Sequence, residues 1–145
     1  MKLFNSLLIS ATVAASTLGQ TIRIGSPAKG TTVKAGSNIT VQVNGAQNST
    51  IEAAVVIGLL SCSPPCPPPA KELGQIIYNG PYFPSLHLNG NGVGPGGISI
   101  YQNLTVTIPA DTPAGPAQLS VTQANFFNDQ SHLVLISDEV LISVE

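Results

Sequence analysis

The only two cysteines, Cys62 and Cys66, lie in the proline-rich stretch LLSCSPPCPPPAKELG, residues 59–74. Cysteines bind metals, exchange disulfides in C-x-x-C motifs, or form structural disulfide bonds. The C-x-x-x-C spacing is too long for the redox motif and is not a usual zinc half-site. Two thiolates and one distant histidine also fall short of the four ligands of a structural zinc site. We therefore expect no metal and no cofactor, and a disulfide if the compartment is oxidising.

The first residues of the chain indicate that compartment. Met1-Lys2 is followed by a mostly apolar run, residues 3–13, and by a small-residue tract that ends at Gly19. This layout is typical of a secretory signal peptide and is too short to span a membrane. We predict a signal peptide over residues 1–19 and a single domain over residues 20–145.

Composition and the later segments argue against membrane insertion and against binding to nucleic acid. No later apolar run is long enough to cross a bilayer, and the final VLISVE is not the hydrophobic tail of a lipid-anchor signal. Charged residues make up 8% of the chain, with 5 Lys and Arg against 7 Asp and Glu, so a basic patch is missing. We expect a secreted, extracellular protein with no membrane span and no affinity for nucleic acid.

In an oxidising compartment, Cys62 and Cys66 are expected to pair with each other. A disulfide needs Cα atoms about 4.4–6.8 Å apart, whereas an extended polyproline conformation would hold them roughly 12 Å apart. Residues 63–65 must therefore form a turn, and a cis peptide bond before Pro65 is one way to make it. The following prolines, residues 67–69, could dock on an aromatic groove, but a stiff connection between strands is the favoured interpretation.

The rest of the chain reads as strands separated by glycine and proline. Apolar and polar residues alternate in SNITVQV and NLTVTIP, which is the period of a half-buried strand. Residues 51–60 are apolar at both parities, which favours a central strand covered on both faces. About seven such segments predict an all-β fold, an immunoglobulin-like antiparallel β-sandwich. The chain has no Trp and no widely spaced cysteines, so the hydrophobic core alone must join the sheets, with the first and last strands near edges.

Three N-x-S/T sequons are candidates for N-glycosylation in a secreted chain. They begin at Asn38, Asn48 and Asn103. The alternation of the surrounding residues places Asn38 and Asn103 on the polar, outward sides of their strands.

The segment from Pro81 to Gly97 is expected to be a long irregular loop, because it is rich in Gly and Pro and lacks a period. Its residues Tyr82, Phe83 and His87 form a candidate binding loop if they are exposed together. The alternative is that Phe83 closes the end of the sandwich.

Catalytic patterns find little support, and we expect the protein not to be an enzyme. The G-x-S-x-G motif of a serine nucleophile is missing. Asp138 and Glu139 are adjacent carboxylates, but neighbours on a strand face opposite sides of the sheet and cannot act as a pair.

Four segments carry a resemblance to a known family: IGSPAKGTTVKAGSNITVQV, IGLLSC, LGQIIYNGPYFP and YQNLTVTIPADTPAGPAQLSVTQANFF. Together they resemble the fungal necrosis-inducing secreted proteins over nearly all of the predicted mature chain. The resemblance implies a small secreted effector that is not an enzyme. It also implies a host protein as partner, namely plant receptor-like kinases whose immune signalling is suppressed, and necrosis of plant tissue.

Two alternatives remain open. The S-P-x-x-G at residues 26–30 and the sandwich pattern are shared with fungal cell-wall assembly domains, so a structural or glucan-associated wall module is the first alternative. A carbohydrate-binding sandwich is the second, although its aromatic contacts would have to come from Tyr or Phe.

Overall fold

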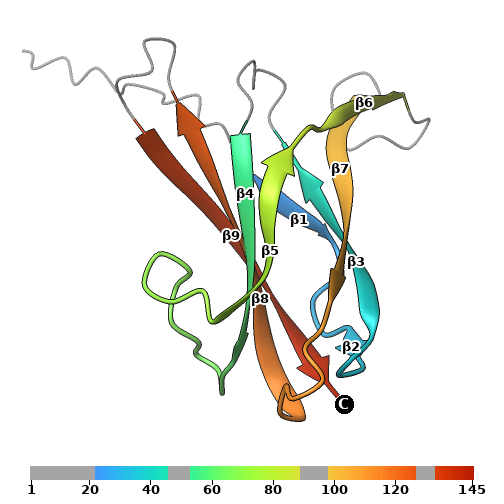
Figure 1. The fold of residues 1–145 in the computed structure, drawn as a ribbon, viewed down its shortest axis with the longest axis vertical. Helices are drawn as coiled ribbons and strands as arrows, with labels where there is room; N and C mark the ends of the chain where they lie inside the picture. Colours follow the sequence, from blue (N-terminus) through green and yellow to red (C-terminus); the bar gives the residue numbers. More distant parts are fainter. Residues whose placement is uncertain (1–21, 46–52, 89–97, 127–132) are drawn as a thin grey trace, which may run out of the picture.

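The computed structural model describes residues 22–45, 53–88, 98–126 and 133–145, and these residues form two packed β-sheets without a helix (Figure 1). The predicted all-β sandwich is confirmed. The predicted signal peptide, residues 1–19, and the sequon residue Asn48 lie outside the described residues.

Each sheet combines strands that are consecutive in sequence with strands that are far apart. The four-stranded sheet has the order β1 (Arg23–Ser26), β3 (Asn38–Asn44), β7 (Ile98–Thr107), β6 (Ser85–Leu88). The five-stranded sheet has the order β2 (Thr32–Val33), β9 (Leu133–Val144), β8 (Gly115–Phe126), β4 (Ala53–Ser61), β5 (Gln75–Tyr82). All neighbours are antiparallel except β2 and β9, which run parallel. This division of the strands between two sheets is that of an immunoglobulin-like sandwich.

The described residues contain nine strands rather than about seven, and one addition corrects the predicted loop. Pro81 and Tyr82 end β5, and Ser85–Leu88 form β6, which pairs with β7. The surrounding Gly and Pro residues concealed the short alternation in SLHL. The rest of the predicted loop, residues 89–97, lies outside the described residues.

The core fills the space between the sheets with alternating aliphatic side chains. Val41 and Val43 of β3 point inward, as the alternation predicts, and both are fully buried. They belong to the same buried cluster as inward-facing residues of the five-stranded sheet, among them Ile57 and Val121. The same cluster includes Val55, Leu59, Leu104, Val106, Ile108 and Leu119. Burial of each such side chain contributes about 1.5–3 kcal/mol, so this cluster is the main attraction between the sheets.

Two hydrogen bonds that involve side chains connect strands of opposite sheets, at two separate positions. At one, the hydroxyl of Tyr82 in β5 donates a hydrogen bond to the carbonyl oxygen of Val43 in β3, at 3.0 Å. At the other, a carboxylate oxygen of Asp138 in β9 accepts a hydrogen bond from the backbone N–H of Ile24 in β1, at 2.7 Å. The first and last strands lie near edges, as expected: β1 is an edge strand, and β9 is covered only by the two residues of β2.

Strand β5 is the other edge of the five-stranded sheet. The hydroxyl of Tyr78 donates a hydrogen bond to the carbonyl oxygen of Pro81 three residues further along the same strand, at 2.9 Å. Proline has no N–H to donate, and it occurs in sheets at positions where that side of the strand faces solvent. Pro81 therefore offers no N–H to an incoming strand, and its carbonyl oxygen already accepts one hydrogen bond.

Tyr82 should make folding stability depend on pH in alkaline solution. Burial raises the pKa of Tyr82 from 10.0 to about 12. Between these values the unfolded chain has lost a proton that the folded chain keeps, so stability is complete below pH 10 and falls as the pH rises to 12. In denaturant titrations, Tyr82→Phe should not show this loss of stability between pH 10 and pH 12. At neutral pH its free energy of unfolding should be lower by about 1 kcal/mol, because the hydrogen bond to Val43 is lost. A Tyr101→Phe control should keep the fall; an unchanged profile in Tyr82→Phe would contradict the assignment.

Candidate functional site

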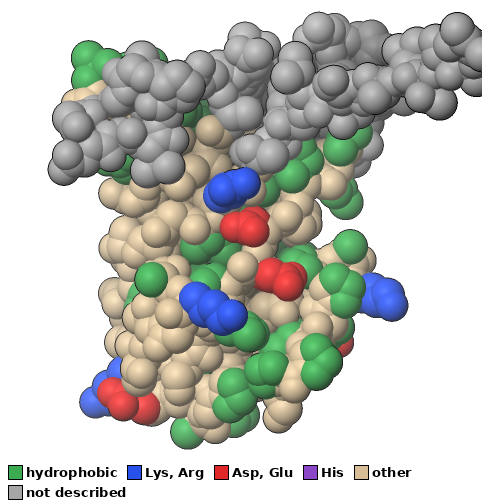
Figure 2. All heavy atoms as spheres, turned by 180° about the vertical axis from the view of Figure 1, so that it is seen from behind, with side chains coloured by type: hydrophobic (Ala, Val, Ile, Leu, Met, Phe, Trp, Pro, Cys, Tyr) green, Lys and Arg blue, Asp and Glu red, His purple; other side chains and the backbone are tan. Residues whose placement is uncertain are grey.

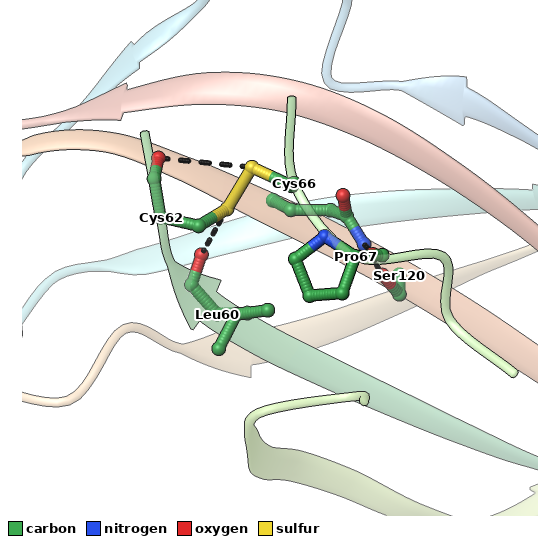
Figure 3. The surroundings of a disulfide bond; sticks show 6 residues. Leu60, Cys62, Cys66, Pro67 and Ser120 are labelled. Atoms are coloured by element: carbon green, nitrogen blue, oxygen red, sulfur yellow. Dashed lines mark hydrogen bonds between the residues drawn. A yellow bond between two sulfur atoms is a disulfide. The ribbon is translucent and has the colours of Figure 1, made fainter. Parts of the chain in front are cut away.

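The two cysteines form the expected disulfide bond. Figure 3 shows the bridge, in which the two Cα atoms are 5.6 Å apart. The peptide bond before Pro65 is cis. The backbone N–H of Cys62 donates to the carbonyl oxygen of Pro116, at 3.2 Å, which extends the pairing of β4 with β8 by one hydrogen bond. The bridge thus closes a turn directly after β4, and the chain then returns toward β5.

The returning segment, residues 62–74, covers part of the outer surface of the five-stranded sheet. Gln118 and Ser120 alternate with the core residues of β8 and therefore face away from the core, yet both are buried. The side-chain amide of Gln118 donates to the carbonyl oxygen of Pro67 at 3.0 Å and to the hydroxyl of Ser120 at 3.2 Å. Pro67 lies beside the disulfide over this strand (Figure 3). Gln118 therefore anchors the proline run to the sheet.

Two glycines allow this close packing. A Cβ atom at Gly58 in β4 would overlap the carbonyl oxygen of Leu73. Gly74 has a φ of +72°, and a Cβ atom added there would overlap the carbonyl oxygen of Leu59. A side chain at this position would therefore be both strained and obstructed. Segment 62–74 is thus held at one end by the disulfide and at the other by backbone contact with β4.

The predicted binding loop divides into a buried part and an exposed part. Tyr82 is only 2% exposed, so its predicted role as a surface contact is wrong: its ring fills the core. Phe83 is 56% exposed and does not close the end of the sandwich. Its backbone N–H donates to the side-chain oxygen of Gln102, at 2.7 Å, which fixes the chain between β5 and β6. Leu86 and Leu88 of β6 are also exposed, and they were not predicted as contacts because β6 itself was not predicted.

His87 lies on the opposite side of β6 from these leucines. Its ring stacks on Tyr101 of β7 with centroids 3.8 Å apart, and its Nε2 lies 3.0 Å from the hydroxyl of Ser85. A serine–histidine pair becomes a nucleophile when a third group orients the imidazole. In the described residues, no carboxylate hydrogen-bonds to His87. The contact with Ser85 and the stack on Tyr101 hold the ring on the surface of the sheet.

The acidic residues behave as the strand pattern predicts. Asp138 and Glu139 face opposite sides of β9, where Asp138 is half-buried against β1 and Glu139 is exposed. Across the described ranges, no three His, Cys, Asp or Glu side chains come together as metal ligands.

The two sequon asparagines inside the described residues are both on the surface. Asn38 in β3 and Asn103 in β7 are exposed on the outer face of the four-stranded sheet, as the alternation predicts. On the face of the molecule drawn in Figure 2, charged side chains are few and lie among uncharged ones.

Comparisons with known proteins leave the family open. Neither a protein-family model nor a curated protein matches the chain. Within the described residues, no helix has the length and apolar character needed to cross a membrane.

Reducing the disulfide should loosen one segment rather than unfold the domain. A closed loop of five residues stabilises by about 2 kcal/mol or less, and segment 62–74 keeps its contacts through Gln118 and Gly58. The double variant Cys62→Ala/Cys66→Ala should therefore remain folded, with a free energy of unfolding lower by about this amount. Hydrogen exchange should quicken in residues 62–74 but not in β3. Alkylation of both cysteines in the wild-type protein without reductant would contradict the bridge.

Proposed function

We propose that the chain is a small secreted, effector-like binding protein that acts by contacting a host protein. Its resemblance to the fungal necrosis-inducing secreted proteins suggests plant receptor-like kinases as the partner class. The proposal is supported by a set of large apolar side chains exposed at one corner of the sandwich.

This hydrophobic corner consists of Phe83, Leu86 and Leu88. Their exposed fractions are 56%, 57% and 76%, and they occupy six consecutive positions of the chain. Single exposed apolar residues are common on protein surfaces, but a group of them marks an interaction site. Aromatic side chains at the centre of such groups tend to supply much of the binding energy.

The corner is also held in place before binding. Gln102 fixes the backbone of Phe83, and β6 pairs with β7 over its four residues. The stack of His87 on Tyr101 braces the other side of the same short strand. A surface that is already ordered loses little conformational entropy on association, so its apolar area contributes more fully to affinity.

The test is binding to purified kinase domains of plant receptor-like kinases. Removing an aromatic anchor costs about 2 kcal/mol or more of binding free energy. Phe83→Ala should therefore raise the dissociation constant by roughly 30-fold. Leu135→Ala is the matched control, because Leu135 is 63% exposed but lies on β9 of the other sheet. Wild-type protein that is enriched no better than an unrelated secreted sandwich would count against kinase binding.

A second candidate function is association with cell-wall glucan. One observation favours it: the outer face of the four-stranded sheet is polar but uncharged along its central strands, with Gln42, Tyr101 and Asn103 among its side chains. Neutral polysaccharides are recognised by hydrogen-bonding groups combined with aromatic surfaces.

Fractionation of a producing culture separates the two functions. A wall module should stay with the insoluble wall after detergent extraction, and Tyr101→Ala should release it because Tyr101 is the aromatic ring of that face. An effector should instead be recovered from the culture fluid. Retention on the wall would remove most of the support for the effector proposal, whereas full recovery in the fluid would exclude wall association.

A further inference from the structure

The two sequons in the described residues face each other across neighbouring strands. Asn38-Ile-Thr40 lies in β3 and Asn103-Leu-Thr105 lies in β7, and the register places Thr40 directly opposite Thr105. Asn38 is opposite Thr107, and Asn103 is opposite Gln42. The two asparagines therefore lie on one face, on either side of the threonine pair, about 13 Å apart along the strand direction.

Both sequons are accessible on the folded sheet. Asn38, Asn103 and the two sequon threonines are all exposed. The side-chain oxygen of Asn38 accepts a hydrogen bond from the hydroxyl of Thr107, at 2.7 Å. This bond uses the amide oxygen and leaves the amide nitrogen, where a glycan is attached, free of that contact. Thr107 would thus position the first sugar at Asn38 without competing for it.

The face between the two asparagines carries no charge on its central strands. Its outward side chains on β3 and β7, among them Gln42, Asn44, Ser99 and Tyr101, are all uncharged. Charged groups normally keep such surfaces apart in solution, and without them a flat hydrogen-bonding face tends to associate. Another bulky hydrophilic group would have to replace charge in that role.

We propose that Asn38 and Asn103 both carry N-linked glycans, which together cover the outer face of the four-stranded sheet and keep it from contact with other macromolecules. In the transfer, the side-chain Nδ2 bonds to the anomeric carbon of an oligosaccharide carried on a lipid diphosphate. The bond from that carbon to the diphosphate oxygen breaks, the amide gives up one proton, and the lipid diphosphate leaves. The proposal depends on secretory entry through residues 1–19 and is independent of the host partner.

Site-resolved mass spectrometry tests occupancy in the full chain secreted from a fungal host. Enzymatic release of the glycans converts each modified Asn to Asp, so both Asn38 and Asn103 should be found converted. Thr40→Val should abolish conversion at Asn38 alone, and Thr105→Val at Asn103 alone. The matched controls Thr40→Ser and Thr105→Ser keep both sequons and should keep both glycans. An unmodified Asn at either position in protein whose signal peptide has been removed would overturn the proposal.

Surface labelling tests whether the glycans cover the face. Tyr101 is two residues from Asn103 on the same side of β7, whereas Tyr78 lies on β5 of the other sheet, and both are partly exposed. Hydroxyl-radical labelling of Tyr101 should rise several-fold in Asn38→Gln/Asn103→Gln, with Tyr78 unchanged as the internal control. The same variant should self-associate at concentrations where the glycosylated protein is monomeric. Equal labelling of Tyr101 in both proteins, or glycosylated protein that binds insoluble glucan, would overturn the covering role.

Discussion

The sandwich depends on one constraint: aliphatic side chains must fill the gap between two sheets that no disulfide bond joins. Immunoglobulin domains often place a tryptophan and an intersheet disulfide in that gap, but here the fully buried positions are occupied by side chains such as Val41, Val43, Ile57 and Val121. These aliphatic contacts supply most of the attraction between the sheets. Two hydrogen bonds also cross between them: the buried hydroxyl of Tyr82 donates to the carbonyl oxygen of Val43, and a carboxylate oxygen of Asp138 accepts from the backbone N–H of Ile24.

Placing the disulfide outside the core has a local consequence. The bridge between Cys62 and Cys66 shapes a segment that lies on the outside of the five-stranded sheet, where Gln118 is buried because that segment covers it. The only position that could accept the approaching backbone of Leu73 is one without a side chain, which explains Gly58 in the middle of an otherwise aliphatic strand. The proline run, the disulfide-closed turn and Gly58 together hold residues 62–74 in place on the sheet, although this segment contains no helix or strand.

The alternation of residues was enough to predict the fold class, the inward residues of β3 and β7 and the outward sequons, because a half-buried strand must repeat every two residues. Tyr82 was misplaced because sequence does not distinguish an aromatic residue at the end of a strand from one that begins a loop. Strand β6 was missed because four residues between glycine and proline tracts carry too little pattern. Gln118 and Asp138 gave no signal, since their contacts join residues 51 and 114 positions apart.

The backbone of Pro81, at the end of edge strand β5, affects how this protein behaves when concentrated. Weak net charge gives little repulsion between copies, and a free β-strand edge is the usual template for sheet-to-sheet growth. A strand that approached this end of β5 would meet Pro81, which has no N–H and whose carbonyl oxygen already accepts a hydrogen bond from Tyr78. The end of β5 is thus a poor site for edge-to-edge pairing, and because this depends on backbone geometry, neither salt nor a modest change of pH would remove it.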